Sequence, residues 1–147
     1  MWFVDWLKSR TAPRPEPEAR VKILVISMLL EDSFFLERLA KEREWRLVFT
    51  NSPREAFTLA SRAHFDLILC DRNQPGYPWR EVVSRLADTS PGSCVLLVSP
   101  VKDDYLWSEA LQNGGYDVLV RPLREKNVLH SVEAALRFIS TADVVSR

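Results

Sequence analysis

The chain has 147 residues, of which 46% are hydrophobic and 27% are charged, and its 20 basic residues balance its 20 acidic ones. This composition is ordinary for a globular domain with a core of its own, and a formal net charge of zero provides no general attraction to nucleic acid. We therefore expect one folded domain and no nucleic-acid partner. No apolar run approaches the ~20 residues that a membrane-spanning helix needs.

The first 20 residues differ in composition from the rest of the chain. Trp2, Phe3 and Trp6 make residues 1–10 strongly apolar, and the stretch that follows is rich in proline and charge, which is typical of a semi-rigid linker. Two interpretations stay open. The segment packs on its own domain or moves freely, or residues 1–10 anchor the chain to a partner protein or a membrane surface.

From Val21 onward, apolar strand-like runs alternate with helical patterns. The expected strands are 21–27, 46–50, 65–71, 94–99 and 117–120, and the expected helices are 32–43, one that begins at Pro53, 78–87, one capped by Asp103 or Asp104, and 124–141. Alternation with short connections predicts an α/β fold, a doubly wound parallel sheet with helices on both faces. The expected boundaries are a leader and linker at 1–20, a folded domain at 21–142 and a tail at 143–147.

The two cysteines, Cys70 and Cys94, lie far apart, each inside an apolar strand-like run. The sequence contains no Cys-x-x-Cys pair and no Cys/His cluster with the spacing of metal ligands. We expect buried, reduced thiols in a cytoplasmic protein.

Three of the expected strands end in polar residues that could form one site. The third ends in Asp71, just before a break at Pro75-Gly76, the fourth ends in Ser99, and Arg121-Pro122 follows the fifth. Because the carboxyl ends of parallel strands meet at one edge of the sheet, we expect these side chains to converge. A carboxylate nucleophile, a hydroxyl donor and a forked cation are groups that phosphoryl transfer uses.

This pattern, over roughly residues 22–140, resembles the receiver domain of two-component response regulators. The resemblance implies a five-stranded sheet with strand order 2-1-3-4-5. It also implies that Asp71 accepts a phosphoryl group from a histidine kinase, with Ser99 and Arg121 in contact with that group. Mg²⁺ would be held by Asp71, by the backbone carbonyl of Asn73 and by two acidic residues after the first strand.

The resemblance also implies a partner face made of the fourth helix, the fifth strand and the fifth helix. This face serves for dimerisation or for binding of a downstream effector. Tyr105, Trp107 and Tyr116 fall on it and are the candidate contact residues, since tyrosine and tryptophan are common at interfaces. A ring of Trp107 packed over the sheet is the alternative.

Several residues depart from the receiver pattern. Ser27-Met28 stand where the acidic pair is expected, and a thioether is a poor ligand for Mg²⁺. Glu31 and Asp32, about one turn further on, are weak metal candidates that we expect instead to cap or flank the first helix. Arg121 replaces the usual lysine, and Val118 stands at the usual aromatic position.

Two functional hypotheses follow from these matches and departures. In the first, the chain is a stand-alone, atypical receiver-like domain that signals by protein–protein contact, with weak or no Mg²⁺-dependent phosphorylation. In the second, it is a functional response regulator phosphorylated on Asp71 by a histidine kinase. In neither is it an enzyme beyond modification of itself. For Asp71 a structural interpretation also remains: a carboxylate satisfied by Arg121 or by backbone N–H groups of the next turn.

Overall fold

The structure is a computed structural model that describes residues 21–26 and 29–146, without the side chains of 143–146. The predicted leader and linker, Ser27-Met28 and Arg147 lie outside the described residues. Strands and helices alternate as β1 (Val21–Ile26), α1 (Leu30–Arg43), β2 (Trp45–Thr50), α2 (Pro53–Arg62), β3 (Leu67–Asp71), α3 (Trp79–Thr89), β4 (Cys94–Ser99), α4 (Asp104–Gln112), β5 (Asp117–Val120) and α5 (Glu125–Ser146).

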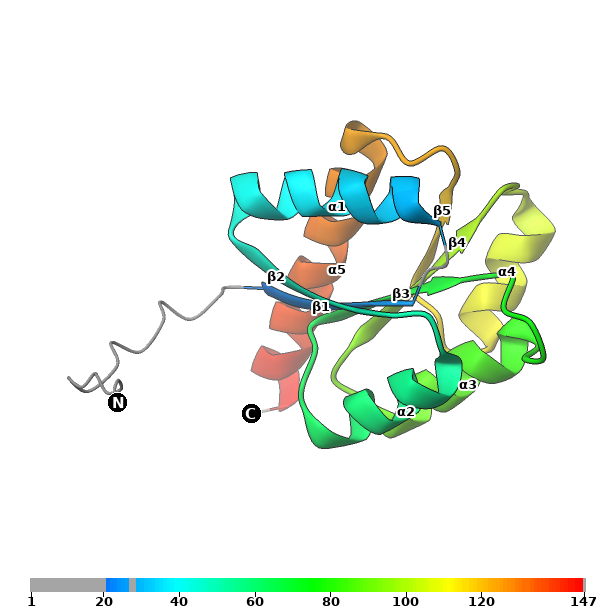
Figure 1. Cartoon of the computed structure of the whole chain (residues 1–147). Helices are drawn as coiled ribbons and strands as arrows, with labels where there is room; N and C mark the ends of the chain where they lie inside the picture. Colours follow the sequence, from blue (N-terminus) through cyan, green and yellow to red (C-terminus); the bar gives the residue numbers. More distant parts are fainter. Residues whose placement is uncertain (1–20, 27–28, 147) are drawn as a thin grey trace, which may run out of the picture.

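The five strands form one parallel sheet in the order β2-β1-β3-β4-β5, which confirms the predicted fold class (Figure 1). Ile26 pairs with Cys70, and Ser99 pairs with Val120, so the carboxyl ends of the central strands lie level. The order reverses between β1 and β3. In open α/β sheets, ligands bind in the crevice that this reversal creates outside the carboxyl ends of the strands.

Helices cover both faces of the sheet, with α1 and α5 on one face and α2, α3 and α4 on the other (Figure 1). Alternate strand residues supply the two cores, since successive side chains of a strand point to opposite faces. In β3, for example, Leu67 and Leu69 pack against α1 and α5, whereas Ile68 and Cys70 pack against the other helices. Both faces are buried, which explains the unbroken apolar runs of the central strands.

Two helix starts follow local capping rules. The Ser52 hydroxyl accepts a hydrogen bond from the backbone N–H of Glu55 at 3.3 Å, and Pro53 occupies the first helical position. Of the two residues predicted to cap the fourth helix, it is Asp103 that does so, accepting from the N–H of Leu106 at 2.8 Å. Such caps are worth about 1 kcal/mol each.

The first and last helices are longer than the sequence predicted. α1 begins at Leu30 rather than Asp32, after Leu29, whose side chain makes no capping hydrogen bond and so gave no signal for the start. α5 continues to Ser146 rather than ending near Thr141, and therefore includes most of the predicted tail. None of the helices in the described part of the chain is both long and apolar enough to span a membrane.

Candidate functional site

The candidate site lies at the carboxyl edge of the sheet, on the face covered by α1 and α5. Asp71 is the last residue of β3 and continues the row of Leu67 and Leu69, so alternation points its side chain to that face. Arg121 directly follows β5, where its backbone N–H donates to the carbonyl of Ser99 at 2.9 Å. Asp71 is only 4% exposed, so its carboxylate needs partners within the protein.

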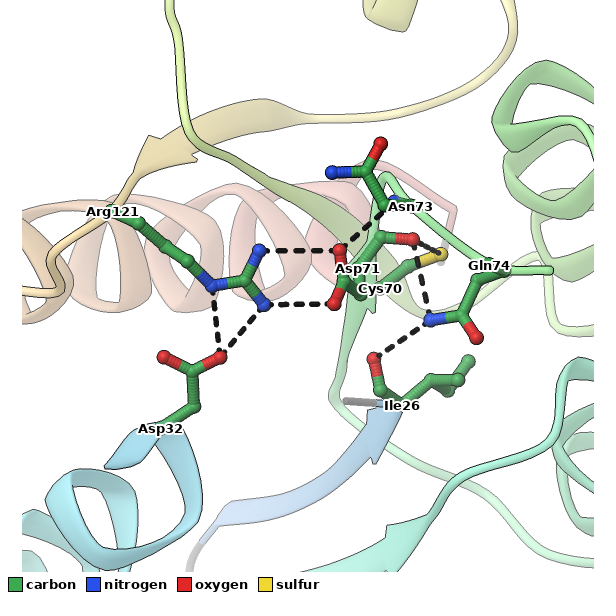
Figure 2. A network of polar contacts seen from close by, with 7 residues as sticks. All are labelled: Ile26, Asp32, Cys70, Asp71, Asn73, Gln74 and Arg121. Carbon is green, nitrogen blue, oxygen red and sulfur yellow. Dashed lines mark hydrogen bonds and ion pairs between the residues drawn. The ribbon is translucent and has the colours of Figure 1, made fainter. Parts of the chain in front are cut away.

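The guanidinium of Arg121 supplies those partners (Figure 2). Its Nη1 donates to Oδ1 of Asp71 at 3.2 Å, and its Nη2 donates to Oδ2 at 2.9 Å. This two-bond, fork-like pairing is the strong form of the arginine–carboxylate interaction. The backbone N–H of Asn73, in the turn after β3, adds a third hydrogen bond to Oδ1 at 2.9 Å. The Asp71 carboxylate is therefore hydrogen-bonded both to Arg121 and to a backbone N–H of the next turn, the two partners expected if Asp71 has a structural role.

Asp32 is the second carboxylate on Arg121. Its Oδ2 accepts from Nε of Arg121 at 2.9 Å and from Nη2 at 2.7 Å, and its side chain is 6% exposed. Asp32 thus flanks the first helix, as the sequence analysis expected, and in addition it takes part in the site. Asp32 does lie in the first turn of α1, but it begins the buried stripe that continues through Leu36 and Leu39. That spacing of four and three residues is the signal by which the sequence could have placed it in the site.

The charge state of Arg121 is set by its two carboxylate partners, Asp32 and Asp71. Burial acts against the charged form of Arg121, yet the hydrogen bonds to Asp32 and Asp71 outweigh it and raise the pKa of Arg121 above its ordinary value. Arg121 therefore stays charged at any physiological pH. The peptide bond that joins it to Pro122 is cis.

Ser99 lies at the same edge, but its hydroxyl has other partners. It accepts from Nη1 of Arg72 at 3.4 Å and from the backbone N–H of Val101 at 3.2 Å. Ser99 continues the row of Val95 and Leu97, which pack on the sheet face opposite to Asp71. The structure thus places Arg121 beside both Asp71 and Asp32. Ser99 instead contacts Arg72, a residue that the sequence analysis did not identify.

Gln74 is a further residue that the sequence analysis did not identify. Its Nε2 donates to the carbonyl of Ile26 at 3.5 Å and to that of Asp71 at 3.4 Å, joining the ends of β1 and β3 (Figure 2). The side chain is buried, and its Oε1 has no hydrogen-bond partner among the described residues. Nothing in the sequence distinguishes this glutamine from a surface residue of a loop.

Comparisons with known proteins agree with this architecture. No family model matches the chain. In sequence it is 25% identical over 123 residues to the transcriptional regulatory protein ZraR of Escherichia coli (strain K12), a match that covers 84% of this chain and 28% of that protein. The ZraR protein of Klebsiella oxytoca is 26% identical over 104 residues, covering 71% and 24%. The chain thus spans about a quarter of the length of the curated relatives it matches.

Solved structures give the stronger likeness. A signal receiver domain of an HD domain-containing protein from Pseudomonas fluorescens Pf-5 superposes with a TM-score of 0.76 and 20% identity, covering 85% of this chain and 93% of that one. The chemotaxis protein CheY4 of Vibrio cholerae gives 0.71 and 19%, covering 78% and 98%. A two-component response regulator from Clostridium difficile gives 0.68 and 21%, covering 80% and 97%.

The fold is that of a receiver domain. Receiver domains typically bind Mg²⁺ at an acidic pocket, and the side chains of this receiver fold fit that ion poorly. The two buried carboxylates both already bind Arg121, and the described residues include no group of three or more His, Cys, Asp or Glu placed to hold a metal. Glu31 is exposed, and Ser27-Met28 lie outside the described residues.

A cleft of about 380 Å³ runs between the start of α1 and the loop that follows β5 in this receiver fold. Its lining consists of Glu31, Asp32, Phe35, Arg121, Pro122 and Leu123. A small solute that enters this cleft therefore meets Asp32 and Arg121, the outer members of the charged cluster, whereas Asp71 does not line it. The cleft gives the cluster a route to solvent on the side of α1.

The predicted partner face presents aromatic side chains to solvent. Tyr105 is 72% exposed and Trp107 is 43% exposed, so the ring of Trp107 is not packed over the sheet. Tyr116 is half-buried and lies against the ring of Phe138 of α5, with 5.4 Å between centroids. Phe138 is itself 56% exposed, so α4 and α5 both carry large apolar groups at the surface.

Proposed function

We propose that this chain acts as an atypical receiver domain of a two-component pathway, which signals by protein–protein contact with weak or no Mg²⁺-dependent phosphorylation of Asp71. The observation that supports this most directly is the double hydrogen bond from Arg121 to the Asp71 carboxylate. We expect the domain to work in the cytoplasm, where its free thiols stay reduced.

The chemistry of phosphoryl transfer explains why that contact matters. An attacking carboxylate needs an oxygen free to approach phosphorus in line, and the transferred group needs cations on its other oxygens. Both Asp71 oxygens accept hydrogen bonds from Arg121, and the charge of Arg121 is already shared by two carboxylates. For an incoming phosphoryl group, the oxygens of Asp71 are therefore already hydrogen-bonded to Arg121. The positive charge of Arg121 is in turn already neutralised by Asp71 and Asp32.

The second candidate function, a phosphoacceptor response regulator, has observations in its favour. Asp71 lies at the carboxyl end of β3, at the reversal of strand order, and a cation is beside it. A donor that draws Arg121 away from Asp71 onto its own oxygens would free the nucleophile while Asp32 continued to hold the guanidinium. A histidine kinase would be the natural partner for this reaction.

Exposure of the chain to acetyl phosphate and Mg²⁺, with intact mass spectrometry as the readout, separates the two. We expect little or no gain of a phosphoryl group, and no difference between wild type and Asp71→Asn. A receiver that carries the acidic pair after its first strand serves as the positive control. Modification of most wild-type molecules, lost in Asp71→Asn, would establish the phosphoacceptor function instead.

The partner surface that we propose consists of α4, β5 and α5, with Tyr105, Trp107 and Tyr116 as contact residues. Two of these side chains are exposed aromatic groups, which cost little conformational entropy to bury and are common at the energetic centres of interfaces. A second copy of the chain or a downstream effector would cover this surface. Contact of residues 1–10 with a membrane or a partner stays a proposal that deletion of that segment would test.

A further inference from the structure

Large apolar side chains are exposed around the start of α1 as well as on α4 and α5. Leu30 is 71% exposed and Phe34 is 68% exposed. They lie four residues apart, so they are neighbours on the surface of the helix. The buried stripe of α1, which includes Asp32 and Leu36, lies on the opposite side of the helix, so Leu30 and Phe34 point away from the sheet.

Phe49 brings a third apolar side chain to this region. It is 37% exposed and lies near the carboxyl end of β2, paired with Val25 of β1. Val25 belongs to the core beneath α1 and α5, so the register places Phe49 on the same face of the sheet as α1. The start of α1 and the end of β2 lie at one edge of the sheet (Figure 1). We call Leu30, Phe34 and Phe49 the α1 surface.

We propose that residues 1–10 of this same chain dock on the α1 surface and cover it. Trp2 and Trp6 are four residues apart, as are Phe3 and Leu7, and this spacing is typical of one apolar stripe. Aromatic side chains bury a large apolar area and commonly anchor interfaces. The inference goes beyond the proposed function and does not depend on phosphorylation of the domain.

The linker is long enough for this contact. β1 begins at Val21, at the edge of the sheet opposite to the start of α1, and its six residues span about 20 Å. Residues 11–20 include three prolines, and ten residues of extended, proline-rich chain span about 31 Å. The linker can thus carry residues 1–10 along the sheet to the α1 surface. A tether of this length gives an effective concentration in the millimolar range, so an intrinsic dissociation constant well below about 1 mM keeps the segment docked.

The α1 surface belongs to the elements next to β1, from which the linker leads away. Leu30 and Phe34 lie on the helix that directly follows β1, and Phe49 lies on a strand that pairs with β1. The exposed Trp107 lies instead on α4, which covers the opposite face of the sheet and connects β4 with β5. Docking on α1 therefore leaves the proposed partner surface free.

Charges around the α1 surface also suit this segment. Glu31 and Glu37, both exposed, flank the exposed apolar pair of α1. Arg38, the nearest basic residue of the helix, already forms ion pairs with two acids, at 3.6 and 3.3 Å. Residues 1–10 carry two basic side chains, Lys8 and Arg10, after the apolar stripe, and one acidic side chain. The segment and the helix surface are thus complementary in charge as well as in polarity.

Docking at this position has a regulatory consequence. The first turn of α1 also lines the cleft that leads to Asp32 and Arg121. A docked segment covers the helix surface beside that cleft, so a partner that binds the start of α1 must first displace it. The tryptophans of the docked segment are meanwhile buried against the domain and are withheld from a membrane or a second protein.

Paramagnetic relaxation in the whole 147-residue chain tests this contact. The two native cysteines are buried, so a nitroxide reagent labels the exposed thiol of a Ser9→Cys variant selectively. We expect the label to broaden the backbone amide signals of the α1 surface. The amide signals of α4 should stay sharp.

Two double variants of the labelled chain remove the contact from either side. Leu30→Gln with Phe34→Gln removes the apolar pair but keeps good helix formers at exposed positions, and Trp2→Ser with Trp6→Ser removes the anchors. Each should lose most of the broadening at the start of α1. Trp107→Gln, which removes an exposed aromatic side chain of α4, is the matched control and should keep it. Dispersion of the amide signals shows in the same spectra that each variant is folded.

Sharp α1 signals in the labelled chain would overturn the inference, and so would broadening found on α4 or α5 instead. Broadening that survives both double variants would overturn it as well. A mixture of isotope-labelled chain with separate nitroxide-labelled chain should show no broadening, since broadening there would assign the α1 surface to a second copy. None of these outcomes depends on modification by acetyl phosphate, so a failure of this inference and a failure of the proposed function are observed separately.

Discussion

Asp32 and Asp71 accept hydrogen bonds from the same nitrogen atom of Arg121, at 2.7 and 2.9 Å. This shared donor connects the first turn of α1, the end of β3 and the residue after β5. All three side chains are largely buried, so solvent screens the interaction little. The cluster therefore joins α1, β3 and the segment after β5 at the carboxyl edge of the sheet.

Loss of Asp32 should destabilise the fold. Asp32→Ala leaves Arg121 with one carboxylate in a buried position, and breaking a buried pair typically costs about 3–5 kcal/mol. Because Asp71 still binds the guanidinium, we expect a loss of about 2–3 kcal/mol in the free energy of unfolding, measured with urea.

Glu31→Ala is the matched control for that variant. Glu31 lies in the same helical turn but is exposed, so its removal should change the free energy of unfolding by less than about 0.5 kcal/mol. Similar losses in the two variants would show that both acids act only on the helix N-terminus.

Cys70 should make stability fall at alkaline pH. Burial, and to a lesser extent the neighbouring charge of Asp71, raises the pKa of the Cys70 thiol from 9.0 to about 12. The folded chain thus keeps a proton that the unfolded chain releases. The stability is complete below pH 9 and is lost as the pH rises toward 12, at up to about 1.4 kcal/mol per pH unit from this thiol.

Urea unfolding of wild type and Cys70→Ala between pH 8 and pH 11 measures this contribution. The variant should lose less stability above pH 9 than the wild type does, and the native wild-type thiol should resist a thiol-labelling reagent. Parallel pH profiles, or rapid labelling of Cys70 in the folded chain, would show that the thiol is not held as the structure indicates.

Trp107→Ala should weaken association without weakening the fold. Trp107 is 43% exposed, and an exposed aromatic side chain contributes little to the stability of the core. As a central contact of an interface, the same side chain contributes about 2 kcal/mol or more to binding. Sedimentation equilibrium of the wild type and the variant measures self-association, and pull-down with a defined effector measures the other mode. Leu111→Ala, on the same helix and 40% exposed, tests whether the effect is specific to the aromatic ring.

Association unchanged in both Trp107→Ala and Tyr105→Ala would place the partner surface elsewhere on the domain. A fall in the melting temperature of Trp107→Ala by several degrees would mean that the ring supports the fold after all.

The sequence predicted most of the fold because its signals were local. Apolar runs marked the buried strands, and Ser52 and Asp103 marked helix starts whose caps the structure contains. The helix ends were less exact where no capping residue exists, as at Leu29. The predicted meeting of Asp71 with Arg121 needed only the rule that parallel strands end at one edge, and that contact is present.

The remainder of the site depended on side-chain direction, which residue type does not reveal. An acid in the first turn of a helix ordinarily interacts with the helix dipole, so the propensity argument kept Asp32 out of the site. Its position four residues before Leu36 in the buried stripe was the stronger signal. The sequence analysis also expected Ser99 to converge on Asp71, but its hydroxyl binds Arg72 and the backbone N–H of Val101. Strand alternation places Ser99 on the face of the sheet opposite to Asp71.

Arg121, and not a metal ion with a phosphoryl group, is the partner of the Asp71 carboxylate. A crystal structure of the wild-type chain grown with Mg²⁺ and beryllofluoride, a mimic of the phosphoryl group, tests this most directly. We expect Nη1 and Nη2 of Arg121 to remain hydrogen-bonded to the two oxygens of Asp71, with no beryllium on that residue. Beryllofluoride bonded to Asp71, with Mg²⁺ beside it and Arg121 displaced, would show that Asp71 is a working phosphoacceptor.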